Sequence, residues 1–147
     1  LLAPIMPRKI LSADLFTFLI FARFFSKLEK LRIISGKGKN TQGENIADNG
    51  GVRESFRAYM KSIEVQGTEQ RLPGLTQYTP EQLFFVSFAQ VWCERITDQG
   101  LASQILTDPH SPGKFRVFGP LSNSEDFVRE WNCPAGPMNR PEKCLLW

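Results

Sequence analysis

Glu44 and Asp48 stand four positions apart in the stretch GENIADNGG, residues 43–51. On a helix this spacing places both carboxylates on one face, about one turn apart, where they repel unless a cation lies nearby. In a zinc site the two could divide the work, with one binding the metal and the other accepting the free ring N–H of a histidine ligand. The alternative is a pair of solvated acids near a helix start, which the helix dipole favours.

His110 is the only histidine of the chain, and it lies in a proline-flanked turn six residues before Arg116. Such a pair could stabilise developing negative charge and bind a carbonyl or a carboxylate. The alternative is a surface histidine in a turn and a solvated arginine. Because a zinc site commonly uses more than one histidine, we do not expect this chain to build one alone.

Helices are the elements that must position these residues. The glycine-rich stretch 35–43 reads as a connector, and apolar residues at helical spacing predict a helix from about Gly51 to Gly67. Thr79 suits the N-cap of a second helix, with Pro80 at its first position and Gln82 closing a capping box. The body of that helix, LFFVSFAQVWC, is apolar nearly all round, which predicts deep burial.

The rest of the chain predicts shorter elements, and the fold class is mainly α. We expect a helix over 101–106, a turn over 108–113 and an extended piece over 114–119. Ser122 or Asn123 is expected to cap a last helix that runs through Trp131. An irregular tail follows.

Length and charge bound the class of protein. The 147 residues are enough for one domain, and a net charge of +3 is too small to indicate nucleic-acid binding. Residues 1–40 have a net charge of +6, from eight Lys or Arg residues and two acidic residues. Residues 41–147 have a net charge of −3, from ten Lys or Arg residues and thirteen acidic residues. This break in net charge predicts two pieces of different origin or role.

The apolar run 11–25 is too short for a membrane span and reads as a helix, although it has the outline of a signal peptide without a convincing cleavage site.

The three cysteines, Cys93, Cys133 and Cys144, cannot all pair within one chain. Either one thiol is free or a partner lies outside the chain.

Four motifs in order carry a resemblance to a known family: NTQGENIADNGGV, LPGLTQYTPEQLFFVSFAQVWC, DPHSPGKFRVFGPLSN and C-x4-MN-x4-C-x2-W. Together they resemble the C-terminal part of the neprilysin and endothelin-converting-enzyme family of zinc metallopeptidases. The resemblance runs from about Gly38 to Trp147. It implies the C-terminal portion of a zincin, a thermolysin-like catalytic domain.

The resemblance implies a role for each candidate residue. Glu44 would be the third zinc ligand, and Asp48 would orient a zinc-bound histidine. His110 would stabilise the tetrahedral transition state, and Arg116 would contact the substrate backbone beyond the scissile bond. The glycines after Asp48 would let the chain turn beside the cleft.

Other family features are absent from this sequence. The HExxH helix, which brings two zinc histidines and the general-base glutamate, does not occur, and neither does the Asn-Ala-aromatic edge strand. We therefore divide the chain into an unassigned segment, 1–36, which reads as a mispredicted or non-homologous piece, and a peptidase portion, 37–147. In the family, the cysteines that match Cys93, Cys133 and Cys144 pair with partners further upstream.

The function implied is a zinc metalloendopeptidase that cleaves peptides on the amino side of apolar residues. The complete enzyme would hold one zinc ion, which this chain alone is not expected to hold. It would act outside the cell or at the cell surface, with any membrane contact made through an upstream anchor. The alternative is a catalytically inert fragment or a non-enzymatic interaction module, and we expect the isolated chain to be inactive.

Overall fold

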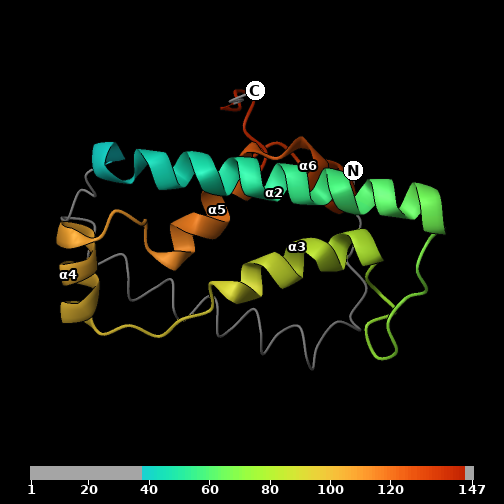
Figure 1. Ribbon diagram of the computed structural model, residues 1–147, viewed down its shortest axis with the longest axis horizontal. Coiled ribbons are helices and arrows are strands. Elements are labelled where there is room, and N and C mark those ends of the chain that lie inside the picture. The colour runs from blue at the N-terminus through green and yellow to red at the C-terminus, as the bar shows by residue number, and fades with distance from the viewer. Residues whose placement is uncertain (1–37, 145–147) are drawn as a thin grey trace, which may run out of the picture. The chain divides into compact units, whose positions relative to one another are not determined.

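The computed structural model describes residues 38–144, which form helices joined by turns and loops (Figure 1). No strand forms in this part of the chain, apart from an isolated bridge between Gly136 and Asn139. The mainly α prediction is therefore confirmed. The segment 1–36 with its apolar run, and Trp147 of the last motif, lie outside the described residues. The helices are α2 (Gly38–Gln66), α3 (Pro80–Val91), α4 (Asp98–Thr107), α5 (Gly113–Asn123) and α6 (Glu125–Trp131).

Helix α2 is the longest element, with 29 residues or roughly 44 Å at 1.5 Å per residue. It ends where the sequence predicts, because Gly67 adopts a left-handed φ of 90° and donates its N–H to the carbonyl of Ile63 at 2.8 Å. Its start is earlier than predicted. The connector expected over 35–43 is helical from residue 38, and the two glycines of the NGG stretch lie inside the helix.

The chain therefore does not turn after Asp48, and the role assigned to those glycines is wrong. A glycine inside a helix costs only about 1 kcal/mol relative to alanine, which tertiary packing can offset. The residues of α2 that pack into the core follow directly after these glycines, where Val52 and Phe56 are buried on one face of the helix. Figure 1 shows α2 running across the view, with α5 beneath its first half and α3 beneath its second.

An aromatic cluster forms the core where α2, α3 and α6 meet. The rings of Phe56 and Phe85 stack at 4.7 Å between centroids, and Phe127 meets Phe85 edge-on at 5.4 Å. Leu121 of α5 completes the buried set, with Tyr59, Met60, Phe84, Phe88, Val117, Trp131 and Met138 packed around it. Burial of this apolar surface is the main force that holds the helices together.

Helix α3 starts as the sequence predicts. The Thr79 hydroxyl accepts from the N–H of Gln82, and the Gln82 side chain accepts from the N–H of Thr79, both at 3.1 Å. Gln82 also donates to the carbonyl of Glu130 at 2.8 Å, which ties α3 to the end of α6. The prediction of deep burial all round is wrong, because Phe85 alone is fully buried on α3 and Val91 is 73% exposed.

Helix α5 replaces the extended piece expected over 114–119. Val117 and Leu121, four positions apart, both pack against the core, so tertiary contact selects the helix over the local β propensity. The helix continues through Asn123 and buries Ser122, so the predicted cap of α6 is also wrong. Ser124 caps α6 instead, accepting from the N–H of Phe127 at 3.1 Å. The short helix expected over 101–106 is confirmed within α4.

Candidate functional site

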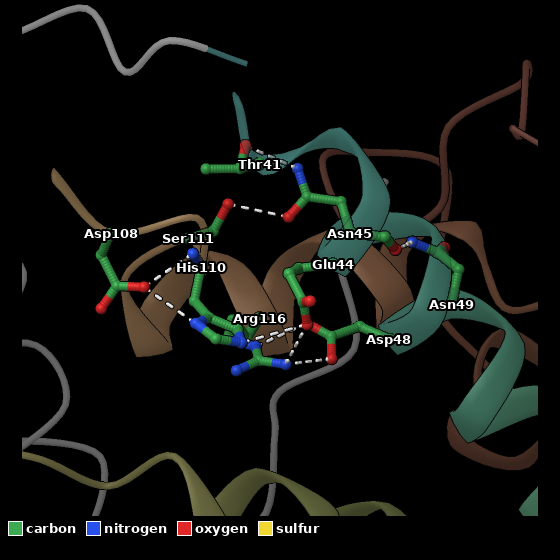
Figure 2. Close-up of polar contacts among 9 residues, drawn as sticks. All are labelled: Thr41, Glu44, Asn45, Asp48, Asn49, Asp108, His110, Ser111 and Arg116. Carbon is green, nitrogen blue, oxygen red and sulfur yellow. Dashed lines mark hydrogen bonds and ion pairs between the residues drawn. The ribbon is translucent and has the colours of Figure 1, made fainter. Parts of the chain in front are cut away.

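The four candidate residues come together on one side of the first half of α2 (Figure 2). Glu44 and Asp48 project from α2, as their spacing predicts. His110 lies in the turn between α4 and α5, and Arg116 lies in the first turns of α5. The structure therefore joins positions that are far apart in the sequence, such as Asp48 and Arg116, which are separated by 68 residues.

Asp48 and Arg116 form a bidentate ion pair. Arg116 donates from Nε to Oδ2 at 2.7 Å and from Nη2 to Oδ1 at 2.6 Å. The two side chains are only 9% and 15% exposed, so water screens the pair little and its charge-assisted bonds are strong. These hydrogen bonds to Asp48 are the largest cause that raises the pKa of Arg116 above its ordinary value.

Trp92 supports the other side of the guanidinium. The Cζ of Arg116 lies 3.9 Å from the centroid of the indole ring, within the range of a cation–π contact. No hydrogen bond or ion pair joins Nη1 of Arg116 to any residue among 38–144. Arg116 is thus held in place by Asp48 and Trp92, with one donor group left for a ligand.

The connection between α3 and α4 also fixes the start of α5. No side chain at Pro112 caps α5, and the carboxylate of Glu94 accepts the N–H of Gly113 at 3.1 Å instead. A Cβ at Gly113 would lie 2.9 Å from this carboxylate and 2.9 Å from the carbonyl of Trp92, so the close approach requires glycine. Sequence reasoning missed Trp92 and Glu94, because their partners are in another element.

His110 lies between two carboxylates. Its Nδ1 is 2.8 Å from Oδ1 of Asp108, and its Nε2 is 3.1 Å from Oε2 of Glu44. Asp108 also accepts the backbone N–H of His110 at 2.8 Å, and this bond is the largest cause that lowers the pKa of Asp108. An ionised carboxylate only accepts, so Asp108 is an acceptor for an Nδ1–H of the His110 ring and Glu44 an acceptor for an Nε2–H.

Asp108 is a site residue that sequence reasoning did not single out. The signal was present, because an aspartate in a proline-containing turn favours an Asx turn, in which its side chain accepts the backbone N–H two residues further on. Its bond to the backbone of His110 has that form.

Glu44 is the carboxylate of the site that remains most accessible, with 41% of its side chain exposed. Its Oε2 lies 3.9 Å from Nη2 of Arg116, as well as near the ring of His110. Asp48 is bound by both of its oxygens to Arg116, and Asp108 accepts two bonds from His110, so Glu44 is the least constrained carboxylate of the site. Within the described part of the chain, no three His, Cys, Asp or Glu side chains gather in a group that could hold a metal ion. These residues alone do not fit a tetrahedral zinc ion.

The cysteines are free thiols, with Cys93 and Cys144 exposed and Cys133 half-buried. No disulfide is observed between them, and their pairing with upstream partners stays a prediction. Within residues 38–144, no helix combines the length and the apolar character needed to cross a bilayer.

A mainly helical unit that gathers two carboxylates, a histidine and an arginine on one face is what the motifs imply for the end of a zincin domain. Comparison with known proteins agrees. The sequence profile of peptidase family M13 matches residues 18–146, and the chain belongs to this family. The match begins upstream of residue 37, within the unassigned segment, so the division at that position stays a prediction.

The relatives are neprilysins and endothelin-converting enzymes. Over 111 residues the chain is 54% identical to neprilysin-11 of Caenorhabditis elegans and 50% identical to human endothelin-converting enzyme 1. Each alignment covers 75% of this chain, but only 13% of neprilysin-11 and 14% of endothelin-converting enzyme 1. It is 47% identical over 129 residues to neprilysin-2 of Drosophila melanogaster, covering 87% of this chain and 16% of that protein. The chain thus spans about one seventh of the length of these relatives.

A solved structure shows the same local fold. The Haemonchus galactose containing glycoprotein complex superimposes with a TM-score of 0.68 at 40% identity, over 72% of this chain and 19% of that one. The resemblance stated from the motifs is confirmed at the level of family and fold. The roles of individual residues remain to be argued from the geometry.

Proposed function

We propose that this chain supplies one side of the active site of a zinc metalloendopeptidase that cleaves peptides on the amino side of apolar residues. The observation that carries the proposal is the convergence of Glu44, His110 and Arg116 on one face, each with a distinct set of neighbours. The role of each residue follows from which of its atoms are still free to act.

Glu44 is the metal ligand in this proposal. Its carboxylate is the most accessible of the site and is held less tightly than that of Asp48, with Nε2 of His110 at 3.1 Å and Nη2 of Arg116 at 3.9 Å. It would complete a ligand set with the two histidines of an HExxH helix, which the printed sequence lacks. Zinc bound there would polarise the scissile carbonyl and activate water.

His110 is the oxyanion donor. Asp108 holds the Nδ1 proton and orients the ring, so Nε2 is the nitrogen that points to the ligand carboxylate at 3.1 Å. A donor beside a metal ligand lies close to where charge develops on the carbonyl oxygen. When protonated, Nε2 can therefore donate to that oxygen in the transition state.

Arg116 is the substrate clamp. Asp48 and Trp92 fix the guanidinium, and the free Nη1 can donate to a peptide carbonyl. Asp48 thus acts first through Arg116, in addition to the histidine-orienting role implied by the family. The Trp92 ring against the guanidinium adds an aromatic surface beside the clamp, which supports preference for an apolar residue next to the cleaved bond.

The competing proposal is a catalytically inert fragment or interaction module. It is favoured for the 147-residue chain by itself, because the described residues contain no complete metal-binding group. We propose activity for the complete enzyme, acting on peptides outside the cell or at its surface, and none for this chain in isolation.

A chimera tests the function directly. The aligned 111-residue segment of human endothelin-converting enzyme 1 is replaced by residues 37–147 of this chain. The chimera should hold one zinc ion and cleave a peptide before an apolar residue, and His110→Phe should lower kcat by roughly 10²–10³-fold. A chimera that is folded by circular dichroism and loaded with zinc, but that cleaves no peptide, would overturn the proposal.

A further inference from the structure

A row of polar side chains runs along α2 beside the carboxylates of the site. Thr41, Asn45 and Asn49 are spaced by four, so they share one face of the helix. Asn45 donates to the Thr41 hydroxyl at 3.1 Å, and Asn49 donates to the Asn45 carbonyl at 2.7 Å. The second bond reaches the backbone carbonyl, whereas the first one orients the Asn45 side-chain amide, whose oxygen, Oδ1, points toward Ser111.

Ser111 bonds to that oxygen. Its hydroxyl donates to Oδ1 of Asn45 at 2.7 Å, across 66 positions of sequence (Figure 2). Ser111 is one of only two buried polar residues among those described, the other being Ser122. A buried hydroxyl stays favourable only while it is hydrogen-bonded, so this bond has one strongly preferred geometry.

The hydrogen bond between Asn45 and Ser111 joins the two residues that adjoin Glu44 and His110 in the chain. Asn45 follows Glu44 directly, and Ser111 follows His110 directly. The other contact between the turn and α2 in this region is the pair of Glu44 with His110, which is about 40% exposed on both sides. Exposed pairs contribute little, and this one uses the two groups that the proposed reaction needs. The Asn45–Ser111 bond uses neither of them.

We propose that Asn45 and Ser111 are positioning residues, whose partly buried hydrogen bond sets the placement of the His110 ring against Glu44. The consequence for catalysis rests on the proposed function. The placement itself does not, since it is a property of this chain. If Glu44 is taken up by a metal, the bond still holds the turn against α2.

The test uses the 147-residue chain, where His110 is the sole histidine and its ring signals in an NMR spectrum are unambiguous. The readout is the nuclear Overhauser effect between the His110 ring and the side chain of Glu44. Ser111→Ala should reduce this signal by more than twofold, and Ser111→Thr, which restores the hydroxyl, should recover it. Ser122→Ala is the matched control, because that buried hydroxyl donates only to the Gly119 carbonyl of its own helix at 3.0 Å.

Asn45→Ala should weaken the same signal as Ser111→Ala, and the double variant should add little more. If either single variant unfolds the chain, as seen by loss of amide dispersion, the other carries the test. A wild-type signal in a folded Ser111→Ala or Asn45→Ala variant would overturn the proposal.

The chimera separates this proposal from the function. There Ser111→Ala should lower kcat roughly tenfold without changing KM, while Ser122→Ala leaves both unchanged. An active chimera whose kcat is insensitive to Ser111→Ala refutes the positioning role alone. An inert chimera, with the NMR signal lost as expected, refutes the function alone.

Discussion

The two halves of α2 have the same backbone and nearly opposite surroundings. From Thr41 to Asn49 the helix meets the turn before α5 and α5 itself through directional polar contacts. From Val52 to Met60 it meets α3 and α6 through aromatic rings. The first half carries the polar side chains of the site, and the second half carries Val52 and Phe56, the two buried residues of α2.

The difference teaches how one helix serves two purposes. Aromatic burial is non-directional and supplies most of the stability, but it does not fix one atom against another. Hydrogen bonds and ion pairs contribute less net free energy and demand one geometry. A rigid helix of 29 residues lets the aromatic half hold the polar half in position. Substitutions in the two halves should therefore separate stability from site geometry.

The largest effect is expected in the aromatic core against which the second half of α2 packs. Phe85→Ala should lower the free energy of unfolding by about 3–5 kcal/mol, because it removes a buried ring and leaves a cavity. Val91→Ala on the same helix should change it by less than about 0.5 kcal/mol, since Val91 is exposed. Urea unfolding measures both. Equal effects of the two substitutions would contradict the claim that the aromatic core supplies most of the stability.

In the polar half, Asp48→Ala should lower the free energy of unfolding by about 2–3 kcal/mol, because Arg116 is left largely buried without its counterion. The effect should be smaller than for a fully buried pair, since water can still reach the guanidinium. The exposed pair of Glu54 with Arg57 provides the control, and Glu54→Ala should cost no more than about 0.5 kcal/mol. If both variants unfold at the same urea concentration, the Asp48–Arg116 pair is not a structural anchor.

The two halves should also respond to opposite extremes of pH. Burial, followed by the charges of Glu69 and Glu81, raises the pKa of Tyr59 to about 12 from 10.0. A raised pKa means that the neutral phenol is favoured in the folded state. The contribution of the neutral Tyr59 phenol to the stability of the fold is complete below pH 10 and is lost as the pH rises through about 12. In thermal melts across this range, the Tm of the wild type should fall relative to that of Tyr59→Phe as the pH rises; an unchanged difference would contradict the raised pKa.

Asp108 should give the smallest effect, at acid pH. The backbone N–H of His110 is the chief cause that lowers the pKa of Asp108 below 3.8. The contribution of the ionised carboxylate to stability is therefore present above pH 3.8 and is lost as the pH falls through the folded-state pKa. The Nδ1 contact of His110 should persist at pH 5 and disappear in strong acid, as read from the ring signals of this sole histidine. Loss of the contact already at pH 5 would show that Asp108 does not hold the ring.

Local signals predicted a good part of the fold. The Thr79 capping box, the glycine that ends α2 and the four-residue spacing of Glu44 and Asp48 each act within one or two helical turns. Such interactions can be seen in a short stretch of sequence, and all of them occur as predicted.

What failed depends on distant parts of the chain. Helix α5 was predicted as extended, because its apolar residues find their partners only after α2 and α3 pack. The start of α2 was predicted too late, because local propensity gives more weight to glycines than the folded chain does. The Asn45–Ser111 bond and the support of Arg116 by Trp92 join residues of different elements, and single-sequence patterns carry no signal for such pairs.

The central claim is that Glu44, alone among the acids of α2, is a zinc ligand. Zinc content of the purified chimera, measured by mass spectrometry after dialysis, tests it without relying on activity. Glu44→Gln should lose the ion, whereas Glu54→Gln, on the same helix but in an exposed pair with Arg57, should retain one zinc per chain. One tightly held zinc in folded Glu44→Gln would contradict the account.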